Sequence, residues 1–263
     1  MFQFELFPVD EIPGWGTPPA LGLHWFGLTY GAYFIQAGET ELLRYSDAWL
    51  AQNQPSAAAW YAGAYVDYQV ARLHEDLLDL LPFATCPVPT EIADLLRRAR
   101  PARVRERLRA RSQSGALSAS QVAAVEEAAE WLRLIKLDMS YLTRSPELRL
   151  WESAGEVTLE WDAPDETSDG VPVWSSAHAR VCMPKGDFVA AVAAFDRELM
   201  SQMEARIAAA RRGWSRPEIA IDLDALEREH AERASWLRNA DRRCIIPPSW
   251  SRIGEGLAFG VEP

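Results

Sequence analysis

A change of hydrophobic period in the middle of the chain, at residues 147–162, most constrains the fold. Apolar and polar residues alternate there on both sides of Ala154-Gly155, which is the pattern of a β-hairpin with one buried face. We expect Leu148, Leu150, Val157, Leu159 and Trp161 on the buried face. Glu147, Arg149, Glu156, Thr158 and Glu160 are then expected in solvent, and Trp151 is expected to point outward.

Two further groups of strands are predicted on either side of this pattern. A third strand within residues 171–183 is expected to pair with the hairpin across the acidic loop 163–170. Near the N-terminus, aromatic and β-branched residues between 24 and 46 predict a second hairpin, with turns near Tyr30-Gly31 and Ala37-Gly38. Both groups are expected to be antiparallel.

The rest of the chain has the period of long amphipathic helices. They are expected at residues 55–81, from Pro89 to about Arg111, from 120 to 135, 187–212 and 221–240, whereas the Pro/Gly-rich tail from Cys244 is expected to be loose. The fold class is therefore α+β, with antiparallel strands packed against several long helices. We expect a single domain over residues 1–263, with two lobes and a hinge near 111–120.

Charge is distributed unevenly along the sequence. The net charge is −11, which argues against a general nucleic-acid binder because phosphate contacts need a basic surface. Residues 97–111 nevertheless contain eight arginines and one glutamate. This segment is expected to form a mostly exposed helix that contacts an acidic partner or RNA, or that pairs with acidic faces of the same chain.

An acidic, tryptophan-bearing segment runs from Trp151 to Trp174 and contains no lysine or arginine. Carboxylates steer a basic partner over long distances, and tryptophans are the anchors that carry much of the energy of an interface. The candidate partner-binding residues are Trp151, Glu152, Glu156, Glu160, Trp161, Asp162, Asp165, Glu166, Asp169 and Trp174, of which Trp161 is the weaker anchor because the alternation places it in the core.

No motif in the sequence identifies a reaction or a cofactor. The four histidines, His24, His74, His178 and His230, lie in different predicted elements without metal-ligand spacing. The three cysteines, Cys86, Cys182 and Cys244, show no zinc or disulfide pattern, and buried positions are expected for them. Nucleotide-binding glycine loops and a nucleophile elbow are missing. We therefore predict no metal, no cofactor and no assigned catalytic residue.

The sequence also lacks the features of a membrane or secreted protein. Its first residues do not have the basic start and continuous apolar run of a signal peptide. No segment approaches the roughly twenty apolar residues that a membrane span requires. A cytoplasmic location without a membrane partner is expected.

Several longer motifs carry a resemblance to a known family. They are LHWFGLTYGAYFI and LLRYS near the N-terminus, then SPELRLW, LEWD, GVPVW and ELMSQMEARIAAARRGW. Together they resemble an uncharacterised, largely actinobacterial family, domain of unknown function 5984, over most of the chain. The resemblance supplies no catalytic residues. By analogy, small acidic families of this kind look like the immunity proteins of bacterial toxin systems.

The leading hypothesis is an immunity-type inhibitor that binds a basic bacterial toxin domain, such as a nuclease, through the acidic segment 151–174. Its carboxylates would then mimic phosphates in the cleft of the toxin. The enzyme alternative is a small-molecule hydrolase or transferase that uses His178 and nearby carboxylates in a cleft. A third hypothesis is an interaction or regulatory module that uses the arginine-rich helix at 97–111.

Overall fold

The computed structural model of the protein describes residues 1–53, 63–98, 100–113, 115, 117–164, 170–241 and 249–261. It has the predicted α+β architecture with antiparallel sheets. The chain divides into two compact units, each assembled from segments that are distant in the sequence. Unit 1 comprises residues 1–79, 171–175 and 189–242, and unit 2 comprises residues 80–170, 176–188 and 243–263. The predicted hinge at 111–120 lies inside unit 2, between two of its helices.

The sheet of unit 1 is centred on β4 (Tyr30–Ala37), which pairs with β1 (Phe2–Leu6) on one side and with β5 (Thr40–Leu42) and β6 (Val66–Gln69) on the other. The predicted turn at Ala37-Gly38 is confirmed, because Gly38 has the positive φ of 61° that joins β4 to β5. The predicted turn at Tyr30-Gly31 is wrong. Gly31 lies within β4, and a Cβ there would come within 2.1 Å of the Glu5 carbonyl oxygen. Glycine is needed at this position for close strand approach.

Helices and a small hairpin complete unit 1. The hairpin pairs β2 (Trp15–Thr17) with β3 (Ala20–Gly22), and two short 3-10 helices, η1 (Val9–Glu11) and η2 (Gly27–Thr29), precede β4. The helices of this unit are α1 (Asp47–Asn53), the first part of α2 (Val70–Ala84), most of α6 (Lys185–Arg212), α7 (Leu223–Arg233) and α8 (Trp236–Asp241). Helix α6 packs on β1 through Phe195, whose ring contacts those of Phe2 and Phe4.

Two predicted helices of unit 1 have different limits in the structure. Of the helix predicted at 55–81, residues 54–62 lie outside the described residues, and 66–69 form strand β6. Helix α2 begins only at Val70 and continues past Pro82 to Ala84. Pro82 lies in the last turn of α2, where it cannot donate the helical hydrogen bond to the carbonyl of residue 78, and the helix ends two residues later. The helix predicted at 221–240 is divided into α7 and α8.

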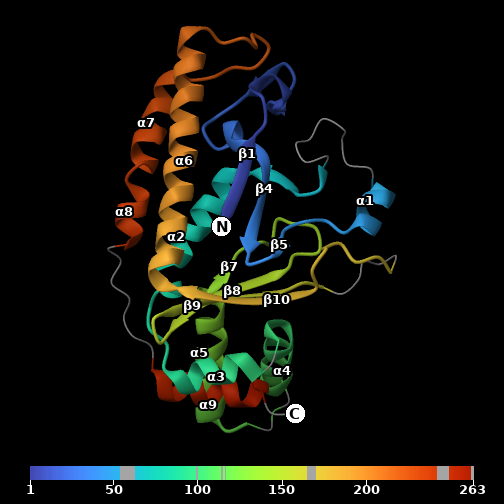
Figure 1. Ribbon diagram of the computed structural model, residues 1–263, viewed down its shortest axis with the longest axis vertical. Coiled ribbons are helices and arrows are strands. Elements are labelled where there is room, and N and C mark those ends of the chain that lie inside the picture. Colours follow the sequence, from blue (N-terminus) through green and yellow to red (C-terminus); the bar gives the residue numbers. More distant parts are fainter. Residues whose placement is uncertain are drawn as a thin grey trace. The chain divides into compact units, whose positions relative to one another are not determined.

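Unit 2 is a four-stranded antiparallel sheet with a layer of helices on one face. The strand order is β10 (His178–Pro184), β9 (Glu156–Asp162), β8 (Glu147–Ser153) and β7 (Lys136–Leu137). β8, β9 and β10 lie side by side in Figure 1. The central hairpin is confirmed, and its turn residues Ala154 and Gly155 both have positive φ. This is the backbone geometry of the tight turns that match the twist of antiparallel strands.

The helical layer consists of α3 (Thr90–Arg98), α4 (Pro101–Gln113), α5 (Ala119–Leu134) and α9 (Trp250–Val261). The arginine-rich segment is helical as predicted, but Pro101 separates α3 from α4 because proline disfavours a helical residue before it and suits a first helical position. Helix α5 begins after Ser118, whose side chain forms a capping box with Gln121. Among the described residues, no helix has the length and apolar character needed to cross a membrane.

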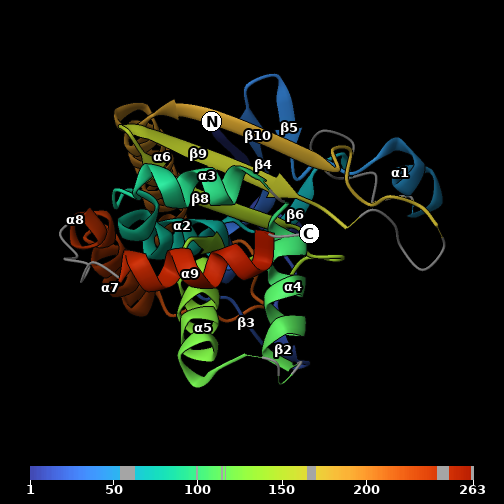
Figure 2. The same ribbon diagram turned by 90° about the horizontal axis from the view of Figure 1, so that it is seen from below.

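The C-terminal tail corrects the prediction of a loose end. Residues 242–248, including Cys244, lie outside the described residues, but residues 250–261 form α9. Helix α9 runs across α3, α4 and α5 (Figure 2). A Cβ at Gly256 would come within 2.2 Å of the Ala124 carbonyl oxygen, so glycine lets α9 and α5 approach closely. The glycines that suggested flexibility in the sequence serve helix packing in the structure.

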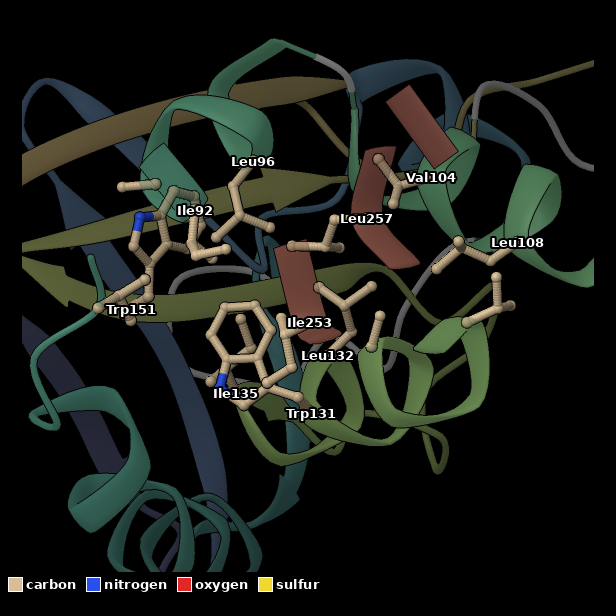
Figure 3. Close-up of a cluster of buried hydrophobic side chains, with 14 residues drawn as sticks. Ile92, Leu96, Val104, Leu108, Trp131, Leu132, Ile135, Trp151, Ile253 and Leu257 are labelled. Carbon is tan, nitrogen blue, oxygen red and sulfur yellow. The ribbon is translucent and has the colours of Figure 1, made fainter. Parts of the chain in front are cut away.

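The core of unit 2 lies between the sheet and these helices. Figure 3 shows its side chains converging from α3, α4, α5, α9 and β8. Ile253 and Leu257 of α9 lie in this cluster together with Leu132 of α5 and Trp151 of β8. Trp151 is fully buried. The expectation that Trp151 points outward is therefore wrong, because the face of the sheet that seemed to be solvated is covered by helices.

Candidate functional site

The covered face of the unit 2 sheet carries charged side chains on all four strands. The register places Lys136, Arg149, Glu160 and Arg180 in one row across β7, β8, β9 and β10. Side chains at paired positions of adjacent strands point to the same face. The sequence predicted that Arg149 and Glu160 face solvent, but both are buried. The alternation correctly predicted which residues share a face of the sheet. The prediction that the polar face is exposed to solvent was wrong.

Glu147 lies at the centre of the ion pairs on this face. Its Oε2 accepts a hydrogen bond of 2.9 Å from Nη2 of Arg149, and its Oε1 forms an ion pair with Arg105 of α4. Glu147 is 4% exposed and Arg149 is 2% exposed. Burial is the main cause that lowers the pKa of Arg149, and Glu147 opposes the shift. A buried arginine of this kind needs its carboxylate partner.

A second set of ion pairs lies at the other edge of the same face. Arg180 donates from Nε to Oε1 of Glu160 at 3.0 Å and from Nη1 to the Arg97 carbonyl oxygen at 3.2 Å. Burial raises the pKa of Glu160, and its contact with Arg180 counteracts this. Arg100 lies 4.0 Å from Asp162. Arginines of residues 97–111 thus pair with acidic residues of the same chain, which is one of the predicted roles of this segment.

The tryptophans of the acidic segment are core residues. Trp161 is fully buried and donates its indole N–H to the Ser176 carbonyl oxygen at 2.8 Å. Trp174 belongs to unit 1, is 4% exposed and stacks on Tyr45 with a ring separation of 5.4 Å. Together with Trp151, they are not exposed anchors in this structure. Their indole rings contribute to the stability of each unit instead.

Three of the carboxylates predicted to bind a partner, Glu152, Glu160 and Asp162, are also buried. Glu152 accepts a hydrogen bond of 2.8 Å from the Gly155 amide and lies 3.8 Å from Nζ of Lys185. Glu156, in contrast, is exposed beside the turn. Asp165, Glu166 and Asp169 lie outside the described residues. The structure therefore does not bring the described members of the set together on an acidic surface.

A pocket of about 410 Å³ opens between α4 and α5 in unit 2. Its apolar wall is formed by Leu108 of α4 and by Val125, Ala129 and Leu132 of α5. Figure 3 shows Leu108 and Leu132 in the core of unit 2, so the wall of the pocket borders that core. A volume of this size is in the range that holds a small organic molecule.

The polar lining of the pocket is strongly basic. It contains five cations, Arg105, Arg109, Arg133, Lys136 and Arg149, and one carboxylate, Glu126. These side chains come from α4, α5, β7 and β8 and were not predicted as a site. The sequence signal for them was limited to the arginine-rich segment and to Val104 and Leu108 one helical turn apart. Nothing in that signal indicated that Lys136 and Arg149 would join them.

Lys136 and Arg149 lie directly opposite each other in the antiparallel pair of β7 and β8. Like charges at such positions destabilise a sheet. Burial lowers the pKa of Lys136; Glu147 raises it, Arg105 and Arg149 lower it further, and Asp138 has a weaker opposite effect. Among the described residues, neither Lys136 nor Arg109 forms an ion pair. The inner end of the pocket is consequently an electropositive site.

The described histidines and cysteines are held in local contacts; His74 Nε2, for example, lies 2.8 Å from Asp196 Oδ1 in the interior of unit 1. His178 is exposed, and its Nδ1 lies 2.8 Å from the Trp161 carbonyl oxygen. Cys86 is half-buried and Cys182 is exposed, so the expectation of buried cysteines is wrong for Cys182. In the described part of the chain, no three His, Cys, Asp or Glu side chains are placed to hold a metal ion. The pocket between α4 and α5 is therefore the strongest candidate site.

Comparison with known proteins identifies the family of the chain. Residues 1–256 match the family of unknown function (DUF5984), and the chain belongs to this family. No curated protein and no solved structure matches the chain. The resemblance inferred from the motifs is thereby confirmed at the level of the family.

Proposed function

We propose that unit 2 is a ligand-binding module that holds a small amphipathic anion in the pocket between α4 and α5. The observation that carries this proposal is the composition of the pocket, in which an apolar wall faces five cations and one carboxylate. This local charge is opposite to the net charge of −11 of the whole chain. Random placement of arginines on an acidic protein does not favour such a concentration around one cavity.

The two parts of the lining suit two parts of one ligand. The apolar wall combines exposed Ala129 with the edges of otherwise buried core residues, so an apolar group placed on it would leave water for a preformed surface. Arg149 is held in position by Glu147, which reduces the conformational entropy that it would lose on binding. The arrangement therefore favours an organic anion over an inorganic ion or a neutral molecule.

A fluorescent amphipathic anion tests the proposal directly. Anilinonaphthalene sulfonate should bind with a stoichiometry of one, measured by fluorescence titration and calorimetry. Ala129 is exposed and lines the pocket, so Ala129→Trp should fill the pocket and reduce the affinity by about tenfold or more. Ala110 is exposed on α4 but does not line the pocket, so Ala110→Trp is the matched control. Equal binding by both variants would reject the pocket as the site.

The inhibitor hypothesis remains an alternative proposal. It is supported by the net charge of −11, by exposed Glu156 and by the acidic residues of the segment 165–169, which lies outside the described residues. A basic toxin domain bound by this segment should be lost at high salt, because exposed charges are screened. Charge reversal at Asp165 and Glu166 should weaken capture of that partner, and unchanged capture would exclude the segment. The enzyme alternative is not supported by this pocket, because His178 is not among the residues that line it.

A further inference from the structure

The charges of the pocket are divided unequally between its rim and its inner end. At the rim, the lining contains the carboxylate Glu126 beside Arg109 and Arg133, and Arg133 also forms an ion pair with Glu130. At the inner end, Arg105, Lys136 and Arg149 line the pocket, whereas the nearby carboxylates Glu147, Glu160 and Asp138 do not line it. The lining of the inner end is therefore formed by three cationic side chains and no carboxylate.

We infer that the ligand of this pocket is a phosphate monoester, with its dianionic head at Arg105, Lys136 and Arg149 and its apolar body on the wall formed by α4 and α5. This inference rests on the proposed function and specifies the ligand class. A phosphate monoester carries close to two negative charges at neutral pH and has three terminal oxygens that accept hydrogen bonds. Its charge and its three oxygens suit the three cationic donor side chains at the inner end of the pocket.

The geometry favours one compact dianion over two separate acidic groups. Lys136 and Arg149 occupy directly opposed positions of neighbouring strands, where side chains start about 5 Å apart. Arg105 approaches the same region, because it shares Glu147 with Arg149. A phosphate placed there would relieve the repulsion among three close cations, and charge-assisted hydrogen bonds to arginine are among the strongest that proteins form.

The apolar body explains why the ligand is a monoester and not free phosphate. The phosphate group would fill only the inner end of the pocket. The rest of the pocket is lined by Leu108, Val125, Ala129 and Leu132. An aromatic or short aliphatic group on the ester oxygen would lie against this wall. Burial of that group contributes about 25 cal/mol per Å² of apolar surface removed from water.

Two ligands that differ in charge but have the same shape provide the test. Naphthyl phosphate and naphthyl sulfate share the ring and the tetrahedral head, but only the phosphate is a dianion at about pH 8. Calorimetry with the full chain should show that the phosphate binds about tenfold more tightly or better, which corresponds to one additional charge-assisted hydrogen bond. Inorganic phosphate should bind much more weakly than naphthyl phosphate.

Variants of the inner end show which side chain is responsible for the preference for the dianionic phosphate over the monoanionic sulfate. Lys136→Met should remove most of the preference for phosphate over sulfate, and Lys136→Arg should keep it. Arg103→Gln, on the exposed side of α4 and outside the pocket lining, should leave the preference unchanged and serves as the control. The thermal midpoint of each unliganded variant establishes that it is folded.

The outcomes separate this inference from the proposed function. Equal affinities for the two naphthyl ligands, or a preference that survives in Lys136→Met, would overturn the dianion inference while leaving a pocket for monovalent amphipathic anions. Equal affinities for inorganic phosphate and naphthyl phosphate would overturn the assignment of a monoester. Failure of anilinonaphthalene sulfonate and of both naphthyl ligands to bind would reject the proposed function itself.

Discussion

Glu147 is a buried carboxylate of unit 2 that pairs with two arginines. Its side chain is almost fully buried and pairs with Arg149 on its own strand and with Arg105 on α4. A buried ion pair is a modest source of stability compared with a well-packed apolar pair, but removal of one partner leaves the other charge buried without compensation. Glu147 is therefore better described as the group that keeps Arg149 charged and in place than as a source of net stability.

We predict that Glu147→Ala lowers the free energy of unfolding by about 3–5 kcal/mol, because Arg149 would lose its carboxylate in the interior. Urea denaturation of the purified variant measures this. Glu130→Ala is the control, since Glu130 pairs with Arg133 on the surface, where such a pair contributes about 0–1 kcal/mol. A loss below about 1 kcal/mol for Glu147→Ala would mean that water reaches Arg149 easily.

Replacement of Lys136, in contrast to replacement of Glu147, should stabilise the unliganded protein. Burial and the neighbouring Arg105 and Arg149 hold its pKa below the usual 10.5 in the folded state, although Glu147 and Asp138 oppose the shift. The protonated side chain is thus less favourable in the folded than in the unfolded chain. We predict that Lys136→Met raises the free energy of unfolding near pH 7 while it weakens anion binding. Such a trade between stability and function is typical of binding sites.

The lowered pKa of Lys136 also determines how the free energy of unfolding changes with pH. Between the lowered pKa of folded Lys136 and 10.5, the unfolded chain binds more protons, so the stability of the wild type rises with pH in this window. The stability advantage of Lys136→Met should accordingly shrink as the pH is raised from about 7 to about 10. Denaturation curves of the two proteins at several pH values provide the comparison. An advantage that stays constant would show that protonation of Lys136 is not its origin.

At the scale of secondary structure, the period of the sequence predicted the type of an element better than its surroundings. The hairpin at 147–162 and the helix at 187–212 follow from their spacing alone, and both are present. The exposure of Glu147, Arg149 and Trp151 was wrong, because alternation tells which residues share a face but not whether a helix covers that face. An ion pair between a helix and the sheet beneath it, such as that of Arg105 with Glu147, has no signature in the local sequence.

The candidate site could not be predicted for the same reason. Arg105 and Arg109 were noted only as part of a basic segment. Lys136 follows α5 and Arg149 lies within the first strand of the hairpin, and neither belongs to a motif. Their meeting depends on the cross-strand register of β7 and β8 and on the position of α4 over that sheet. The acidic segment was more conspicuous in the sequence, but most of its described carboxylates are paired internally.

Helix α9 provides a prediction that belongs to this scale. A side chain at Gly256 would collide with the α5 backbone, because its Cβ would lie 2.2 Å from the Ala124 carbonyl oxygen. Gly256→Ala should therefore destabilise the protein by about 1–3 kcal/mol, although alanine is intrinsically the better helix former.

Gly186 in α6 is the matched control for Gly256. A Cβ there has no neighbour within 4 Å, so Gly186→Ala should be neutral or stabilising by up to about 1 kcal/mol. Thermal or urea denaturation of the two variants measures the difference. A Gly256→Ala protein as stable as Gly186→Ala would show that α9 can move away from α5 without loss.

At the scale of the whole molecule, both units depend on segments from different parts of the chain. Unit 2 takes its helical layer partly from residues 90–134 and partly from residues 250–261. Residues 189–242, which belong to unit 1, lie between these two segments in the sequence. Such contacts between distant segments slow folding, because loop closure must precede them. They also mean that a short C-terminal segment can control the integrity of the proposed binding site.

We predict that deletion of residues 249–263 unfolds the helical layer of unit 2. The deletion removes Ile253 and Leu257, which are fully buried, and loss of a single buried side chain of this kind costs about 2–5 kcal/mol. Two such losses approach the total stability of about 5–15 kcal/mol of a typical domain. Hydrogen exchange should show loss of protection in α3 and α5, and anilinonaphthalene sulfonate should no longer bind with a stoichiometry of one.

A synthetic peptide of residues 249–263, added in trans, distinguishes a structural role of α9 from general damage to the protein. Because the lost contacts are apolar and fit around Gly256, the peptide should restore protection in α5 and recover the ligand site in a concentration-dependent way. A peptide that carries Gly256→Leu should fail to do so, since its side chain collides with the backbone at Ala124. Full protection of α5 in the truncated chain without peptide would show instead that α3, α4 and α5 form a stable layer on the sheet by themselves, and that α9 is an addition to it.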